Sequence, residues 1–115
     1  MKKMLLLIFI SIFSSEILAD CSIAKTSPEI QKCLNNEVRS LRSQLDKVYQ
    51  NIQQQTQAKL ELQKSQDLWV KYKEMQCGDF VVADSQGSPA TIEYDLACQS
   101  ILYKQRIDLL KSIFN

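Results

Sequence analysis

The sequence predicts a small all-α domain of three helices, stapled by disulfides, with one irregular loop between the second and third helices. Three observations support this prediction: apolar residues recur every three or four positions, the chain of 115 residues has only two glycines and two prolines, and it has four cysteines. Apolar spacing of three or four residues places side chains on one face of a helix. The segment 80–82 (Phe-Val-Val) is the best candidate for extended chain, but the sequence offers no second strand to pair with it. We therefore expect no sheet.

Residues 1–19 have the order of a secretory signal peptide: a basic start, about ten apolar residues, and a small residue, Ala19, at the expected cleavage site. The apolar run is too short for a transmembrane helix, which needs about 20 residues. Lipid attachment at Cys21 is disfavoured because Asp20 stands where that modification needs a small residue. We expect a soluble mature domain, residues 20–115, without a membrane anchor, in the periplasm or secreted.

All four cysteines lie in the predicted mature domain: Cys21, Cys33, Cys77 and Cys98. In a small exported chain an even number of cysteines indicates a disulfide framework. Zinc is disfavoured because the sequence has no C-x2-C pair and no histidine, and we expect no metal and no cofactor. Locality favours Cys21–Cys33 and Cys77–Cys98, each closing a loop worth about 3 kcal/mol in the chain-entropy model. The pairing Cys21–Cys77 with Cys33–Cys98 also satisfies the distance arguments and stays open.

The first helix is expected to begin at Ser27-Pro28, since serine offers an N-cap hydroxyl and proline suits the first helical position. Seven residues form its apolar stripe: Ile30, Leu34, Val38, Leu41, Leu45, Val48 and Ile52. The glutamine-rich stretch 53–57 has no apolar residue, so we expect it to connect the first helix to the second.

The second helix is expected from about Ala58 to Gln76, with Gly78 as its C-terminal stop. Its buried residues should be Leu62, Leu68, Trp69, Tyr72 and Met75. Residues 78–88 would then form the irregular loop, and the third helix would begin near Pro89 after a second Ser-Pro pair. The apolar stripe of the third helix is Ile92, Leu96, Tyr103, Ile107, Leu110 and Phe114, widened by Leu102, Leu109 and Ile113.

The composition argues against an enzyme and against nucleic-acid binding. There are 14 Lys+Arg and 13 Asp+Glu, so the net charge of +1 gives no broad attraction to nucleic acid or to an acidic membrane. The absence of histidine removes the commonest general base and every Ser-His or Cys-His nucleophile pair. Asp67 and Glu74, two helical turns apart, would permit a wall hydrolase, but so small a domain offers no obvious sugar cleft. We expect a non-enzymatic module that binds a protein partner.

The loop 78–88 is the best candidate for partner binding, because recognition residues often lie on loops of a rigid scaffold. A disulfide that starts at Cys77 would brace this loop and lower the ordering cost of binding. Its candidate binding residues are Asp84, Ser85, Gln86 and Ser88. The structural alternative is that residues 80–82 cap the core and the remainder forms a solvated turn.

Two further pairs of residues have a structural and a functional interpretation. Trp69 and Tyr72 are expected to pack in the core, with stacking on a ligand as the alternative. Lys73 and Arg106 are expected to pair with carboxylates, with a basic binding spot as the alternative. The carboxylates considered for this pairing are Asp46, Asp67 and Glu74.

Several spaced residues are similar to those of a known family. The pattern opens with Cys21-Ser-Ile-Ala24-Lys25, Glu29-x-x-x-Cys33 and Leu45-Asp46-x-x-Tyr49. Its most specific part follows Leu62 and reads Gln66-x-x-Trp69-x-x-x-Lys73-x-x-x-Cys77, and Cys98 and Tyr103-x-x-Arg106-x-x-x-Leu110 close it. The chain resembles the lysozyme inhibitor LprI-like N-terminal domain family over the whole mature part, with Lys73 where an arginine is more usual.

The resemblance implies a small, helical, exported and disulfide-bonded domain, and its name implies inhibition of a lysozyme-type muramidase. Such an enzyme works with two carboxylic groups in its cleft, to which an inhibitor must offer hydrogen-bond donors. Ser85, Gln86, Ser88 or a nearby lysine would supply them. The alternative is a structural or accessory envelope protein that docks its helices on a larger assembly, which a contiguous exposed apolar strip would favour.

Overall fold

The computed structural model describes residues 21–114, and every regular segment among them is helical. The predicted all-α class is therefore confirmed, while the predicted signal peptide, residues 1–19, lies outside the described residues. In chain order the elements are η1 (Cys21–Ile23), α1 (Ser27–Gln55), α2 (Lys59–Lys73), η2 (Glu74–Val81), α3 (Val82–Asp84) and α4 (Thr91–Phe114). The segment η1 is a 3-10 helix and η2 is a π-helix.

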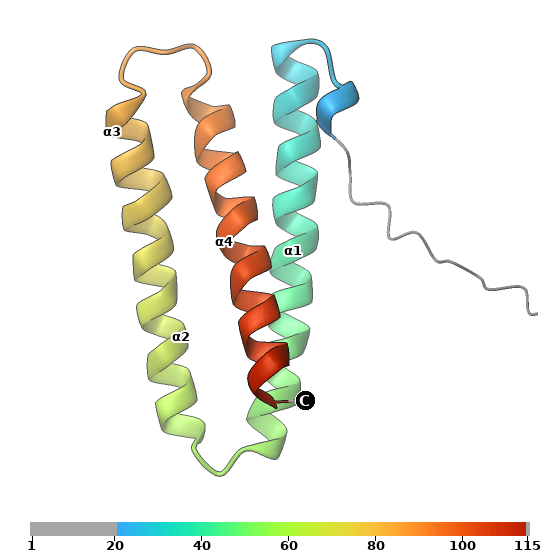
Figure 1. The fold of residues 1–115 in the computed structure, drawn as a ribbon, viewed down its shortest axis with the longest axis vertical. Helices are drawn as coiled ribbons and strands as arrows, with labels where there is room; N and C mark the ends of the chain where they lie inside the picture. Colours follow the sequence, from blue (N-terminus) through green and yellow to red (C-terminus); the bar gives the residue numbers. More distant parts are fainter. Residues whose placement is uncertain (1–20, 115) are drawn as a thin grey trace, which may run out of the picture.

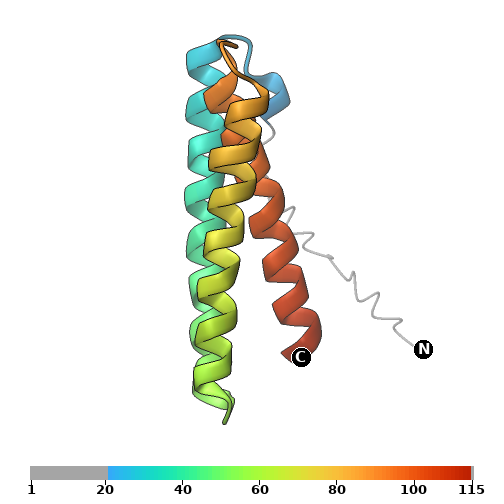
Figure 2. The same ribbon diagram turned by 90° about the vertical axis from the view of Figure 1, so that its left-hand side faces the viewer.

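The described chain forms three long helical rods (Figure 1). The first is α1, the second is the continuous run of α2, η2 and α3, and the third is α4. The second rod runs antiparallel to the other two, and α4 lies between α1 and the second rod in Figure 1. Figure 2 shows that α4 leans away from the other two rods toward its C-terminal end.

The core lies where α1 and α4 pack against each other, with one contribution from α2. Its buried residues are Val38, Leu41, Leu45, Ile52, Leu62, Tyr103, Ile107 and Leu110. Seven of these eight belong to the predicted stripes of the first and third helices, so these two stripes do form the core. Burying each side chain of this size stabilises the fold by about 1.5–3 kcal/mol.

The prediction for the second helix is largely wrong about burial. Leu62 is buried and Trp69 is partly buried, but Leu68, Tyr72 and Met75 are 65%, 53% and 64% exposed. The reason is geometric. One side of the second rod covers the α1–α4 pair, and no helix among the described residues packs on the side with Leu68 and Met75, while Tyr72 borders an open groove beside α4. On α4, the predicted stripe residues Ile92, Leu109, Ile113 and Phe114 are likewise exposed.

The first helix begins and ends slightly differently from the prediction. The N-cap is Thr26, in an extended conformation, and its Oγ1 accepts a hydrogen bond from the backbone N–H of Glu29 at 3.3 Å. Ser27 is already helical, and its hydroxyl donates to Glu93 on α4 instead. At the other end, α1 continues through Gln55, since glutamine is a good helix former. The predicted connection 53–57 therefore shrinks to residues 56–58.

The second helix does not stop at Gly78. This glycine lies inside η2, and the rod continues to Asp84. A glycine ends a helix by taking a left-handed conformation, and the positive-φ glycine is Gly87, with φ of +78°. The predicted loop 78–88 is thus reduced to a turn over residues 85–90, and α4 begins at Thr91.

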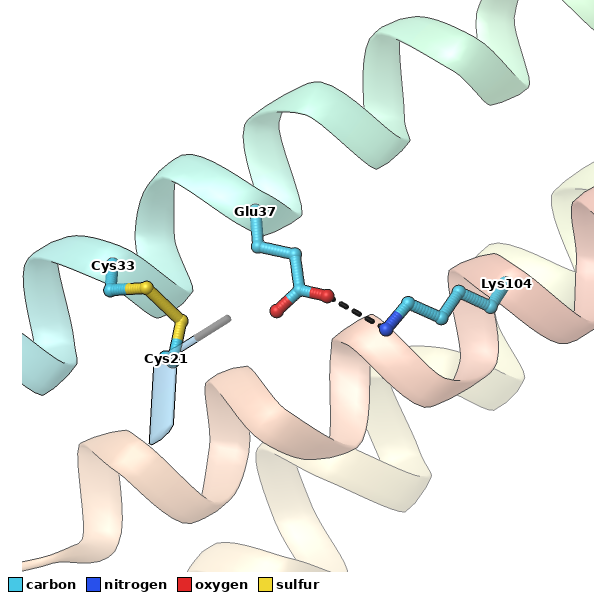
Figure 3. The surroundings of a disulfide bond; sticks show 4 residues. All are labelled: Cys21, Cys33, Glu37 and Lys104. Carbon is cyan, nitrogen blue, oxygen red and sulfur yellow. Dashed lines mark ion pairs between the residues drawn. A yellow bond between two sulfur atoms is a disulfide. The ribbon is translucent and has the colours of Figure 1, made fainter. Parts of the chain in front are cut away.

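Both predicted disulfides, Cys21–Cys33 and Cys77–Cys98, are confirmed, with Cα–Cα distances of 5.6 and 5.5 Å. The alternative pairing is wrong. The first bond holds η1 against α1, and the second holds η2 against α4. One turn beyond Cys33, Glu37 forms an ion pair of 2.7 Å with Lys104 of α4 (Figure 3).

Candidate functional site

The turn between α3 and α4 lies at one end of the molecule, where α1 also begins (Figure 1). Hydrogen bonds from its own side chains stabilise the conformation of this turn. The Ser85 hydroxyl donates to the carbonyl of Val81 at 2.8 Å, and the Thr91 hydroxyl donates to the carbonyls of Ser85 and Ser88 at 3.1 and 2.8 Å. Gly87 supplies the left-handed position that reverses the chain. The Cys77–Cys98 disulfide joins η2 to α4 about two helical turns away from Ser85. It therefore links the two helical segments that the turn connects.

The four candidate binding residues of this turn differ in what they can still offer. The proton of Ser85 is used within the turn, as its hydroxyl donates to backbone carbonyls. The Ser88 hydroxyl accepts from the N–H of Ala90 at 3.2 Å and keeps its own proton for another partner. The side chains of Asp84 and Gln86 are exposed and form no hydrogen bond with any residue between 21 and 114. The available groups are one carboxylate, one amide and one hydroxyl.

An open groove of about 790 Å³ begins at this turn and follows α4. Asp84 and Ser85 line one end of the groove, whereas Gln86 and Ser88 do not line it. Three large apolar side chains also line it and are about half exposed: Tyr72 at 53%, Tyr94 at 52% and Ile101 at 57%. The groove therefore offers an exposed apolar surface next to the polar turn.

The sequence did not identify Tyr94 and Ile101 as candidates. Apolar residues on a helix are normally assigned to its core face, and the pair lies two turns apart on another face of α4. Their spacing of seven residues, offset from the buried residues Tyr103, Ile107 and Leu110, is the signal that marks a second apolar face.

A second cluster joins the most specific residues of the family pattern. Trp69 and Tyr103 meet edge to face with ring centroids 5.3 Å apart, so α2 and α4 touch through these rings. The Nζ of Lys73 lies 5.0 Å from the Tyr103 ring centroid and 5.9 Å from that of Trp69. The Arg106 guanidinium lies 6.0 Å from the Trp69 ring. Trp69 thus has the packing role expected of it, whereas Tyr72 points to the groove.

The expected pairing of Lys73 and Arg106 with carboxylates is wrong. Arg106 donates from Nε to the amide oxygen of Gln66 at 3.1 Å and from Nη2 to the Ser65 hydroxyl at 3.2 Å. Lys73 donates from Nζ to the Tyr103 hydroxyl at 3.1 Å. Burial lowers the pKa of Arg106, which still leaves a guanidinium fully charged at neutral pH.

Arg42 of α1 also reaches this cluster, and nothing in the sequence marked it. Its Nε donates to the Tyr103 hydroxyl at 3.3 Å, which raises the pKa of Arg42. Burial by itself would raise the pKa of Tyr103, but the hydrogen bonds from Arg42 and Lys73, and the charges of both, outweigh it. The net effect is that the pKa of the Tyr103 phenol is lowered from its ordinary value of 10.0.

Residues 21–114 also bear on three other kinds of function: metal binding, hydrolysis and membrane insertion. This part of the chain has no group of three or more side chains placed to hold a metal ion. Within it, none of the helices combines the length and apolar character needed to cross a membrane. Asp67 and Glu74, the carboxylates considered for hydrolysis, are exposed and do not line the groove.

Comparison with known proteins identifies a family. The model of the family described as lysozyme inhibitor LprI matches residues 19–110, which include all four cysteines, the turn, and both clusters of side chains described above. No curated protein and no solved structure matches the chain. The family match covers most of the 115 residues. The chain therefore belongs to the lysozyme inhibitor LprI family.

Proposed function

We propose that this chain is an exported, non-enzymatic protein-binding module that inhibits a lysozyme-type muramidase. Membership of the LprI family supports a protein-binding role of this kind. The observation that carries the proposal is the pairing of a braced polar turn, residues 84–88, with an exposed apolar groove that begins beside it.

The turn supplies the polar part of the interaction. A muramidase cleft holds two carboxyl groups that flank the scissile bond. The Gln86 amide and the Ser88 hydroxyl are the donors of the turn that remain available, and they would bind these carboxyl groups. Because hydrogen bonds from Thr91 already fix the turn, little conformational entropy is lost when it enters a cleft.

The groove supplies the apolar part. Tyr72 and Tyr94 line it, and half-exposed tyrosines are frequent anchors of protein interfaces, since they bury a large area with few rotatable bonds. The rim of the muramidase cleft would cover these rings while the turn enters the cleft. Tyr94 is the central anchor in this arrangement, because it belongs to α4 and lies near the turn.

A turbidity assay on cell walls treated with lysozyme tests this function. The purified exported protein in molar excess should slow lysis by at least one lysozyme class. Tyr94→Ala should raise the concentration needed for half inhibition by about tenfold or more, as loss of an interface anchor costs about 2 kcal/mol. Phe80→Ala is the matched control, since Phe80 is 60% exposed but does not line the groove. Undiminished lysis by several lysozyme classes would refute the proposed function.

A second candidate function is docking on a larger envelope assembly. The observation in its favour is the exposed apolar strip on the second rod formed by Leu68, Tyr72 and Met75. Strips of this kind often mark interaction surfaces. Cross-linking in intact envelopes separates the two functions: Leu68→Asp should abolish an envelope cross-link and leave inhibition of lysozyme unchanged. If no cross-linked partner forms, this second function is excluded.

Export and the domain boundaries belong to the same proposal. A signal peptide of residues 1–19 supplies the export, and residues 20–115 form the mature domain, which the oxidising environment outside the cytoplasm supplies with two disulfides. N-terminal sequencing of the exported protein should begin at Asp20. A product that begins at Met1 would contradict the proposed cleavage.

A further inference from the structure

Three cationic side chains, one from each rod, gather around Tyr103 and Trp69. Arg42 comes from α1, Lys73 from α2 and Arg106 from α4. Arg106 is satisfied by Gln66 and Ser65, as described above. Arg42 and Lys73 instead donate to one and the same phenol oxygen, at 3.3 and 3.1 Å. Their two positive charges are therefore close together.

Among residues 21–114, no carboxylate forms an ion pair with Arg42 or Lys73. Within this part of the chain the ion pair that forms is Lys104–Glu37, which involves neither Arg42 nor Lys73. Asp46, one turn after Arg42, acts on that arginine only through space. A shallow hollow next to Lys73 is lined by three carboxylates, but none of them forms an ion pair with it: Glu74, Asp79 and Asp95.

The Tyr103 hydroxyl is also incompletely used. A phenol oxygen can accept hydrogen bonds and has one proton to donate. Here it accepts from both Arg42 and Lys73, and no acceptor for its proton lies among the residues that the structure describes. Tyr103 itself is only 3% exposed, so its proton reaches solvent poorly. Two cations without an ion-pair partner in the described part of the chain provide a favourable environment for an anion, which reaches them from the exposed sides of Arg42 and Lys73.

We infer that Arg42 and Lys73, held together by the Tyr103 hydroxyl, form a binding site for a carboxylate group. Arg42 is exposed and Lys73 is partly exposed, so a ligand can approach their remaining N–H groups from solvent. Arg42 and Lys73 lie on either side of the Tyr103 hydroxyl oxygen. The two oxygens of a carboxylate lie in one plane, so each can accept a hydrogen bond from one of these two donors. The rings of Trp69 and Tyr103 form an apolar wall that strengthens the charge-assisted bonds. This site is separate from the groove and does not depend on the proposed muramidase target.

The fluorescence of Trp69 gives a direct measurement, because it is the only tryptophan of the chain and contacts Tyr103. The purified exported protein is titrated with sodium acetate, with sodium chloride replaced to keep the ionic strength constant. The emission should change saturably, with a Kd of about 1–10 mM for so small a ligand. Lys73→Gln and Arg42→Gln should each weaken binding about tenfold, whereas Lys73→Arg should retain it. Lys71→Gln is the matched control, an exposed lysine on α2 outside the cluster.

Further arms identify the source of the carboxylate and check folding. A capped tripeptide with a central glutamate is compared with the same peptide containing glutamine. Tighter binding of the glutamate peptide than of acetate assigns the site to an acidic side chain of a protein, and equal binding assigns it to small carboxylates. Acetate should also raise the melting temperature of the wild type and not of Lys73→Gln. An unsaturable response, equal responses in both Gln variants and wild type, or tighter binding of inorganic phosphate than of acetate would overturn the inference.

Discussion

The Tyr103 hydroxyl connects all three rods through single side chains. Arg42 of α1 and Lys73 of α2 donate to it, and its ring belongs to the core between α1 and α4. The two hydrogen bonds hold the second rod over the α1–α4 pair at a place where a ring of Trp69 also packs. A cationic hydrogen bond contributes about 1.5–3 kcal/mol when it is shielded from water. These few polar contacts therefore position α2 where apolar burial alone is sparse.

The ionisation of Tyr103 gives a pH prediction. Its folded-state pKa is lowered, and its unfolded-state pKa is near 10.0, so between these values the unfolded chain binds the proton and the folded chain does not. The free energy of unfolding should therefore rise with pH through this window, and the gain is lost as pH falls through the folded pKa. In an ultraviolet titration, the phenol of Tyr103 should ionise below the ordinary tyrosine pKa value of 10.0.

A variant checks the cause of this shift. In Lys73→Gln the cation is lost while burial remains, so the pKa of Tyr103 should move upward. Lys71→Gln, on the same helix, should leave it unchanged. A Tyr103 pKa that is the same in Lys73→Gln and in the wild type would contradict the described cluster.

The two glycines provide a matched pair at the scale of the helical elements. Gly78 lies inside η2, and a Cβ added there meets no atom within 4 Å, so Gly78→Ala should raise the free energy of unfolding by about 0.5–1 kcal/mol. Gly87 has φ of +78°, so Gly87→Ala should lower it by about 1 kcal/mol. Urea denaturation measures both. A destabilising Gly78→Ala would show that the helix ends there, as the sequence alone had suggested.

The two disulfides should contribute differently. Without Cys77–Cys98 the unfolded chain gains freedom over a separation of 21 residues while η2 stays packed on α4 in the folded state. Replacing both cysteines by serine should lower the free energy of unfolding by about 3 kcal/mol. Without Cys21–Cys33 the short η1 arm gains freedom in the folded state as well, so the loss should be smaller. Equal losses in urea denaturation would contradict this difference.

The sequence predicts best those helices that supply most of the core residues, which are α1 and α4. The stripes of α1 and α4 gave the correct helices because Leu41, Leu45 and Ile107 are buried against each other. Periodicity could not show that one side of α2 lacks a partner, so Leu68 was expected to be buried and is exposed. The prediction that the second helix ends at Gly78 was wrong, because glycine permits a helix to end but does not require it.

At the scale of the whole molecule, the feature that matters for binding is the open groove between the second rod and α4. The α1–α4 pair forms the base, and the second rod covers it while Tyr72 and Tyr94 remain accessible in the groove. The sequence could predict the polar residues of the turn, since they surround Gly87. It could not predict the groove, because a groove depends on how far two rods separate rather than on the residues of either one.

The most direct test of the proposed binding surface is the mapping of backbone amide shifts in the isotopically labelled protein upon addition of lysozyme. The amides of residues 85–88, together with those of Tyr94 and Ile101, should shift or broaden in proportion to complex formation. Amides on the exposed face of α1, such as that of Arg39, should not change. Shifts confined to α1, or an unchanged spectrum at saturating lysozyme, would contradict binding through the turn and groove.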